Sequence, residues 1–70
     1  MKDLIRLNVN LNPETAEALR DQASKQGISI TETIRRCIAV YAFIRTEHGK
    51  GNRVIIERSD GSHRREMVIM

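Results

Sequence analysis

Residues 4–12 read L-I-R-L-N-V-N-L-N, and this alternation of apolar and polar side chains decides the fold. A period of two is typical of a β-strand, in which successive side chains point to opposite faces. One face of the predicted strand is aliphatic and consists of Ile5, Leu7, Val9 and Leu11. The opposite face consists of Arg6, Asn8 and Asn10. We expect the aliphatic face to be buried and the polar face to remain accessible.

Two helices are predicted directly after this strand. Asn12-Pro13-Glu14 is a helix start, with Asn as the N-cap, and the first helix extends to about Gln26, before Gly27. Ser29-Ile30-Thr31-Glu32 has the pattern of a capping box and opens a second helix that extends to about residue 47 or 48. Apolar stripes at helical spacing are expected to face the core: Ala16, Leu19 and Ala23 in the first helix, and Ile34, Cys37, Ile38, Tyr41 and Ala42 in the second.

The last third of the chain is predicted to form a β-hairpin. Residues 49–52, Gly-Lys-Gly-Asn, form a linker, and residues 53–58 and 63–70 are predicted strands joined around Asp60-Gly61. We expect an apolar face of this hairpin to lie over Val40, Phe43 and Ile44, which widen the apolar surface of the second helix. The chain is thus expected to divide into a domain over 1–48, the linker and an extension over 53–70.

The length of the chain points to oligomerisation. Seventy residues bury too little surface to be comfortably stable without disulfides, a metal or a partner. Cys37 is the only cysteine, and the pattern around it predicts a small core residue and not a nucleophile. His48 and His63 have no zinc-ligand spacing, so neither a metal nor another cofactor is expected.

The charge balance allows a polyanionic partner without requiring one. The net charge is +3 and the isoelectric point is about 9.6, values that a solvated surface explains about as well. Residues 1–3 lead into the alternating pattern instead of an apolar signal segment, and no apolar run is long enough to span a bilayer. We expect a cytoplasmic protein.

The first fifty residues resemble the ribbon-helix-helix superfamily, whose Arc- and MetJ-type members bind DNA through a β-ribbon. The resemblance is carried by I-R-L-N-V-N-L at 5–11, by Leu19 and Ala23, and by G-I-S-I-T-E-T-I-R at 27–35. It implies an α+β fold, mostly α, in which strands 5–11 of two copies pair antiparallel in an intertwined homodimer. The implied dimer core consists of Ile5, Leu7, Val9, Leu11, Leu19, Ile34, Ile38 and Tyr41.

In such a dimer the polar face of the ribbon enters the major groove of double-stranded DNA. Arg6 would then contact guanine, and Asn8 and Asn10 would contact adenine, because these residue types match the hydrogen-bonding edges of those bases. The alternative is a solvated strand face, but asparagine is depleted in strands, so two of them favour a function. Asn10 has a second alternative, which is to fix the corner between strand and helix.

A second set of residues is expected to bind DNA phosphates. The amides of Ser29, Ile30 and Thr31 begin the second helix, where the helix dipole attracts an anion. Arg35 occupies a basic position common in the second helix of the family, and Lys2 is a further electrostatic candidate. Plain N-capping by Ser29 and a surface salt bridge of Arg35 are the alternatives.

These features predict a dimeric, sequence-specific transcriptional repressor, extended on DNA by higher-order assembly. One alternative is an antitoxin that autoregulates its operon and binds a toxin through its C-terminal segment, and another is a protein-interaction module that uses the hairpin edge. Arg58, Arg64 and Arg65 also allow an accessory DNA contact. No enzyme is expected: Asp60, Ser62 and His63 have the residue types of a catalytic triad, but they crowd a predicted turn.

Overall fold

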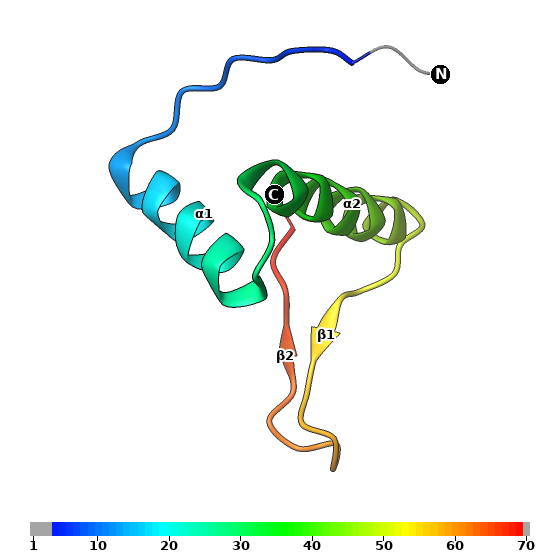
Figure 1. The fold of residues 1–70 in the computed structure, drawn as a ribbon. Coiled ribbons are helices and arrows are strands. Elements are labelled where there is room, and N and C mark those ends of the chain that lie inside the picture. The colour runs from blue at the N-terminus through cyan, green and yellow to red at the C-terminus, as the bar shows by residue number, and fades with distance from the viewer. Residues whose placement is uncertain (1–3, 70) are drawn as a thin grey trace. The chain divides into compact units, whose positions relative to one another are not determined.

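A computed structural model of the chain describes residues 4–69. Its elements are α1 (Pro13–Gln26), α2 (Ile30–Gly49), β1 (Ile55–Ile56) and β2 (Arg65–Glu66), in that order (Figure 1). The two strands pair antiparallel, so the described chain is mostly helical with one small sheet, as an α+β fold requires. The chain divides into two compact units, Met1–Thr33 and Ile34–Met70.

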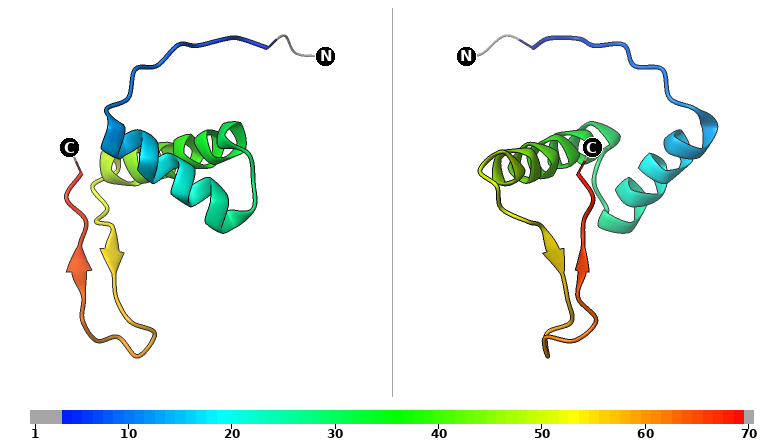
Figure 2. Two further views of the ribbon diagram at one scale, coloured as in Figure 1. Left: turned by 60° about the vertical axis from the view of Figure 1, so that its left-hand side comes forward. Right: turned by 180° about the vertical axis from the view of Figure 1, so that it is seen from behind.

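Residues 4–12 form neither a helix nor a strand in the structure. The segment is an extended chain that leads into α1 (Figure 2), and Asn12 at its end has extended backbone angles, φ −69° and ψ 161°. A β-strand exists only where a neighbouring strand supplies hydrogen bonds, and within residues 4–69 no strand pairs with this segment. The predicted strand is therefore not formed within the single chain, and its pairing with a second copy stays a prediction.

Both predicted ends of α1 are confirmed. The Asn12 side chain accepts a hydrogen bond from the Thr15 amide at 2.8 Å, and Pro13 stands at the first helical position. At the other end Gly27 adopts a left-handed φ of 66°, which costs least for a residue without a Cβ. The Gly27 amide donates to the Ser24 carbonyl and the Ile28 amide to the Ala23 carbonyl, which is the Schellman pattern.

The apolar face of α1 is also confirmed. Ala23 is 5% exposed and Ala16 and Leu19 are partly buried. The opposite face carries the exposed ion pairs Arg20–Glu17 at 3.4 Å and Lys25–Asp21 at 2.9 Å. Such exposed pairs contribute little to stability in water.

The second helix begins with the predicted cap and ends slightly later than predicted. Ser29 Oγ accepts from the Glu32 amide at 3.0 Å. The helix includes Gly49 and closes with the same hydrogen-bond pattern as α1: the Gly51 amide donates to the His48 carbonyl and the Asn52 amide to the Glu47 carbonyl. Local capping groups thus define both ends of both helices.

The hairpin forms around Asp60-Gly61 with shorter strands than predicted. Ile55 lies opposite Glu66 and Ile56 opposite Arg65, and the Met67 amide extends the ladder by donating to the Val54 carbonyl at 2.8 Å. The turn is closed by the Gly61 amide, which donates to the Arg58 carbonyl at 2.8 Å. Gly61 has a φ of 85°, as a three-residue hairpin loop with a glycine bulge requires.

A second irregularity interrupts the second limb of the hairpin. The Arg58 amide donates to the Ser62 carbonyl at 2.9 Å, whereas Ile56 pairs with Arg65, so one residue more lies on the second limb between these pairings. His63, which has a φ of 57°, is this extra residue. An inserted residue of this kind is a β-bulge, which re-aims the side chains around it.

The expected burial of the second helix is not seen in the single chain. Ile34, Cys37, Ile38, Tyr41 and Ala42 are all exposed, and Ile38 is 62% exposed. The prediction that the hairpin covers the end of α2 is wrong for Val40 and Phe43, since Phe43 is 66% exposed. The physical reason is that each paired strand has only two residues, and only those of β1, Ile55 and Ile56, are apolar, which is too little surface to cover these residues.

Candidate nucleic-acid interface

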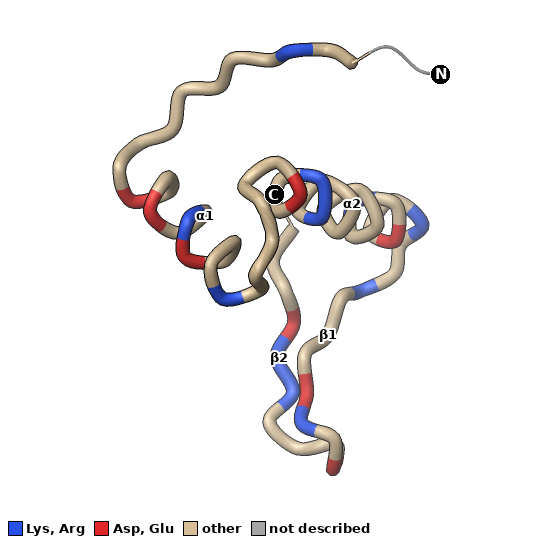
Figure 3. The backbone as a smooth tube through the Cα atoms, in the orientation of Figure 1, with Lys and Arg blue, Asp and Glu red and all other residues tan. Residues whose placement is uncertain are grey.

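The three predicted base-reading residues lie on the extended segment that precedes α1. Arg6, Asn8 and Asn10 are all exposed, and Arg6 is the only charged residue of 4–12 (Figure 3). Among the described residues, none forms an ion pair with Arg6. A guanidinium in this state keeps all five N–H donors available for a ligand.

The aliphatic residues that alternate with them are exposed as well. Ile5 is 84% exposed, Leu7 81% and Val9 71%, with Leu11 at 44%. Full burial of one such side chain is worth about 1.5–3 kcal/mol, so leaving this set in water is costly. The single chain therefore does not provide the core that the aliphatic face of this segment needs.

The helical members of the predicted dimer core differ from one another in burial. Leu19 is partly buried in its own chain, whereas Ile34, Ile38 and Tyr41 are exposed. Within residues 4–69, Ala23 is the only buried hydrophobic residue. A chain of this length with one buried alanine lacks the apolar burial that offsets the conformational entropy of folding.

The predicted phosphate-binding residues gather at the start of α2, with two exceptions. Ser29 caps the helix through its hydroxyl, and the Thr33 hydroxyl donates to the Ser29 carbonyl at 2.9 Å. Ile30 and Thr31 are the first helical residues, whose amides have no acceptor inside a helix. Arg35 is exposed and already engaged in an interaction within the chain. Lys2 lies outside the described residues.

The structure brings together the triad residue types at the hairpin turn, but in an order that a serine hydrolase does not use. Ser62 Oγ lies 2.6 Å from Asp60 Oδ1 and 2.9 Å from His63 Nδ1. The hydroxyl has one hydrogen, and at this distance the carboxylate receives it, so the imidazole donates to the serine oxygen. A catalytic serine instead donates to its histidine, which in turn donates to the aspartate. The arrangement is that of a hydrogen-bonded turn.

Ser62 also influences the acidity of the Asp60 carboxyl group. Its side-chain and backbone hydrogen bonds lower the pKa of Asp60 below the usual value of 3.8. A carboxylate with a lowered pKa stabilises the folded hairpin at pH values above the unfolded pKa, and this contribution is lost as the pH falls through the folded pKa.

Replacing this hydroxyl tests the turn. In Ser62→Ala we expect the pKa of Asp60 to rise towards 3.8, because the side-chain hydrogen bond is the largest cause of the shift. Carboxyl-carbon NMR over the acid range measures it, with Ser59→Ala in the same turn as the matched control. An unchanged Asp60 pKa in Ser62→Ala, or an equal change in Ser59→Ala, would contradict this account of the turn.

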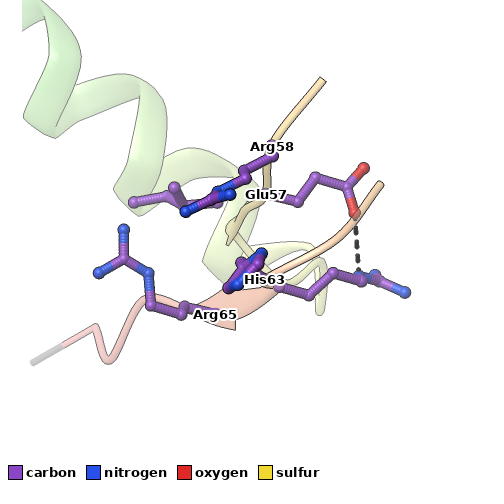
Figure 4. A pocket seen from close by; sticks show the side chains of 6 residues that line it. Glu57, Arg58, His63 and Arg65 are labelled. Carbon is purple, nitrogen blue, oxygen red and sulfur yellow. Dashed lines mark ion pairs between the residues drawn. The ribbon is translucent and has the colours of Figure 1, made fainter. Parts of the chain in front are cut away.

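The sequence grouped Arg58, Arg64 and Arg65, and in the structure the three differ in their ion pairs. Arg64 Nε lies 3.2 Å from Glu57 Oε2, and Arg53 forms a second cross-strand pair with Glu66 at 3.5 Å. Arg58 and Arg65 line a hollow on the hairpin together with Ile56, His63 and the Glu57–Arg64 pair (Figure 4). The bulge at His63 produces this grouping, and no local sequence pattern announces a bulge.

Comparisons with protein-family models, with curated proteins and with solved structures found no match. Within residues 4–69, neither helix combines the length and the apolar character needed to cross a bilayer. In the same range, His, Cys, Asp and Glu side chains do not gather into a group able to hold a metal ion.

Proposed function

We propose that this chain is a homodimeric, sequence-specific DNA-binding protein that represses transcription. The single observation that carries the proposal is the extended segment 4–12, in which exposed aliphatic side chains such as Leu7, 81% exposed, alternate with two asparagines and with Arg6, which has no ion-pair partner within residues 4–69. An extended segment of this kind has backbone N–H and C=O groups without strand partners, and it pairs readily with another strand. A second copy of the same segment is the partner that the chain itself supplies.

Pairing of two copies about a two-fold axis would bury the aliphatic side chains that are exposed in the single chain. In an antiparallel ribbon, the aliphatic faces of both copies turn to the same side and pack on the exposed apolar residues of the helices, among them Ile34 and Ile38. The shared core is then built from both chains. Homodimers of small subunits commonly fold and associate in one step.

The same pairing presents the polar residues outward as one surface. A two-stranded ribbon fits the major groove, where Arg6 suits guanine and Asn8 and Asn10 suit adenine. The Ile30 and Thr31 amides at the start of α2 would hold backbone phosphates and fix the register without reading sequence. Two-fold symmetry then predicts an operator with two related half-sites.

The described C-terminal segment favours a repressor over an antitoxin. An antitoxin tail remains disordered until it folds on its toxin, whereas β1 and β2 pair with each other within this chain. Because the strands of the hairpin pair with each other, the exposed apolar surface that needs a partner lies in the proposed DNA-binding half of the chain.

Selection of bound duplexes from a random DNA pool tests the proposal. We expect enrichment of sites with two-fold or repeated half-sites, with an affinity that falls steeply as salt rises because phosphates are contacted. Scrambled versions of the enriched site are the matched control. A pool that stays random after repeated rounds would refute sequence-specific binding.

A further inference from the structure

The four arginines of the hairpin fall into two kinds, those with and those without an ion pair. Arg53 and Arg64 face Glu66 and Glu57 across the strands, at 3.5 and 3.2 Å. Arg58 and Arg65 have no carboxylate partner among the described residues. Arg64 and Arg65 are neighbours in sequence, so side-chain alternation along the strand directs them to opposite faces of the hairpin. The charges of Arg53 and Arg64 are offset by these ion pairs, whereas no described carboxylate offsets the charges of Arg58 and Arg65.

The two unpaired arginines line one hollow. Figure 4 shows the side chains of Arg58 and Arg65 extending from the two limbs to the same side of the hairpin, with His63 between them in this view. Glu57 turns away to the opposite side, where it pairs with Arg64. The residues that line the hollow are Ile56, Glu57, Arg58, His63, Arg64 and Arg65, and the one carboxylate among them, that of Glu57, is paired with Arg64.

The position of His63 is fixed by the turn that precedes it. Its Nδ1 lies 2.9 Å from Ser62 Oγ, and that hydroxyl is held in turn by Asp60 at 2.6 Å. The Asp60 carboxylate is occupied by the Ser62 hydroxyl and the Ser62 amide, so its charge is bound within the turn. The ring that this contact holds lines the hollow.

We propose that this hollow, lined by Arg58, His63 and Arg65, binds a backbone phosphate of the DNA held by the same dimer. A phosphodiester presents two oxygens with one negative charge, and guanidinium groups bind such oxygens through paired N–H donors. The contact positions the dimer without reading bases. This inference rests on the proposed function, and it assigns to the hairpin a DNA contact separate from the ribbon.

Salt dependence of binding is the test, because each phosphate contact changes the slope of log K against log salt by about 0.9. In Arg58→Gln/Arg65→Gln, we expect the slope to become less steep by about 2, one phosphate for each hairpin of the dimer. The matched control is Arg20→Gln/Arg53→Gln, which removes the same charge at two exposed, ion-paired arginines that do not line the hollow and is expected to keep the wild-type slope. Equal slopes in the two double variants would overturn the proposal.

The single variants Arg58→Gln and Arg65→Gln keep the proposal testable if the double glutamine variant fails to fold: each is expected to make the slope less steep than that of the wild type, and wild-type slopes in both would overturn the proposal. Arg58→Lys/Arg65→Lys retains both charges, so a folded dimer of this variant is expected to keep the wild-type slope. Loss of slope in this variant would overturn the proposal. Circular dichroism and sedimentation confirm the fold and the dimer of every variant.

The outcomes separate this inference from the proposed function. Sequence-specific binding with no slope difference between the two double variants overturns the hairpin contact alone. Binding without sequence preference, but with the predicted slope difference, supports the hairpin contact and overturns the sequence-specific repressor. A wild-type chain that binds no duplex overturns both.

Discussion

Leu7→Lys is expected to abolish the dimer and to leave the chain largely unfolded. In the proposed dimer, Leu7 of each copy turns into the shared core, so the substitution places two charges there and removes two aliphatic side chains. Loss of a buried leucine typically costs about 2–5 kcal/mol, and a buried unpaired charge adds to that cost. Because marginal domains have about 5–15 kcal/mol of stability in total, the doubled effect exceeds what a small dimer tolerates.

The neighbouring position offers the matched control. Asn8→Lys adds the same charge to the polar face of the ribbon, and we expect it to leave the dimer and its unfolding midpoint nearly unchanged. Sedimentation equilibrium and thermal unfolding followed by circular dichroism measure both variants. The reverse result, a folded dimer in Leu7→Lys and an unfolded chain in Asn8→Lys, would mean that the two faces of the segment are exchanged.

Arg6→Ala is expected to remove most of the sequence specificity while the dimer stays folded. Arg6 is exposed and unpaired in the described chain, so its removal leaves no buried partner unsatisfied. A bidentate contact to guanine contributes about 1–3 kcal/mol of discrimination, and a symmetric dimer makes it twice. The ratio of specific to non-specific affinity should therefore fall by at least one order of magnitude, with a smaller change in non-specific affinity.

Arg20→Ala is the control for this loss of charge. Arg20 is an exposed arginine of α1 that pairs with Glu17 at 3.4 Å, and it lies outside the predicted base-reading set. Competition binding with the selected site and a scrambled duplex measures both variants. An equal loss of specificity in Arg20→Ala and Arg6→Ala would show that net charge, and not base reading, governs the affinity.

The features that the sequence predicted correctly are those governed by neighbouring residues. Asn12 and Ser29 cap the helices through hydrogen bonds that span three residues, and Gly27 is required by a local backbone angle. The turn at Asp60-Gly61 belongs to the same class. Such signals act within one turn of chain, so they can be identified without knowledge of the rest of the fold.

The features that the sequence did not predict depend on distant residues. Residues 4–12 have the alternation of a strand, yet a strand needs a partner, and the single chain offers none among its described residues. Phe43 is not covered as expected, because the paired part of the hairpin has only two residues in each strand and those of β2 are charged. The grouping of Arg58 with Arg65 follows from the bulge at His63, whose position is set by cross-strand pairing.

The most direct test of the account is an isotope-filtered NMR measurement on a sample that mixes labelled and unlabelled chains. If two copies of residues 5–11 form the ribbon, interchain contacts should appear between the backbone protons of this segment in one chain and the same segment in its partner. The aliphatic side chains of Leu7 and Val9 should also contact the helices. A stably folded monomer of 8.0 kDa without interchain contacts in this segment would contradict the account.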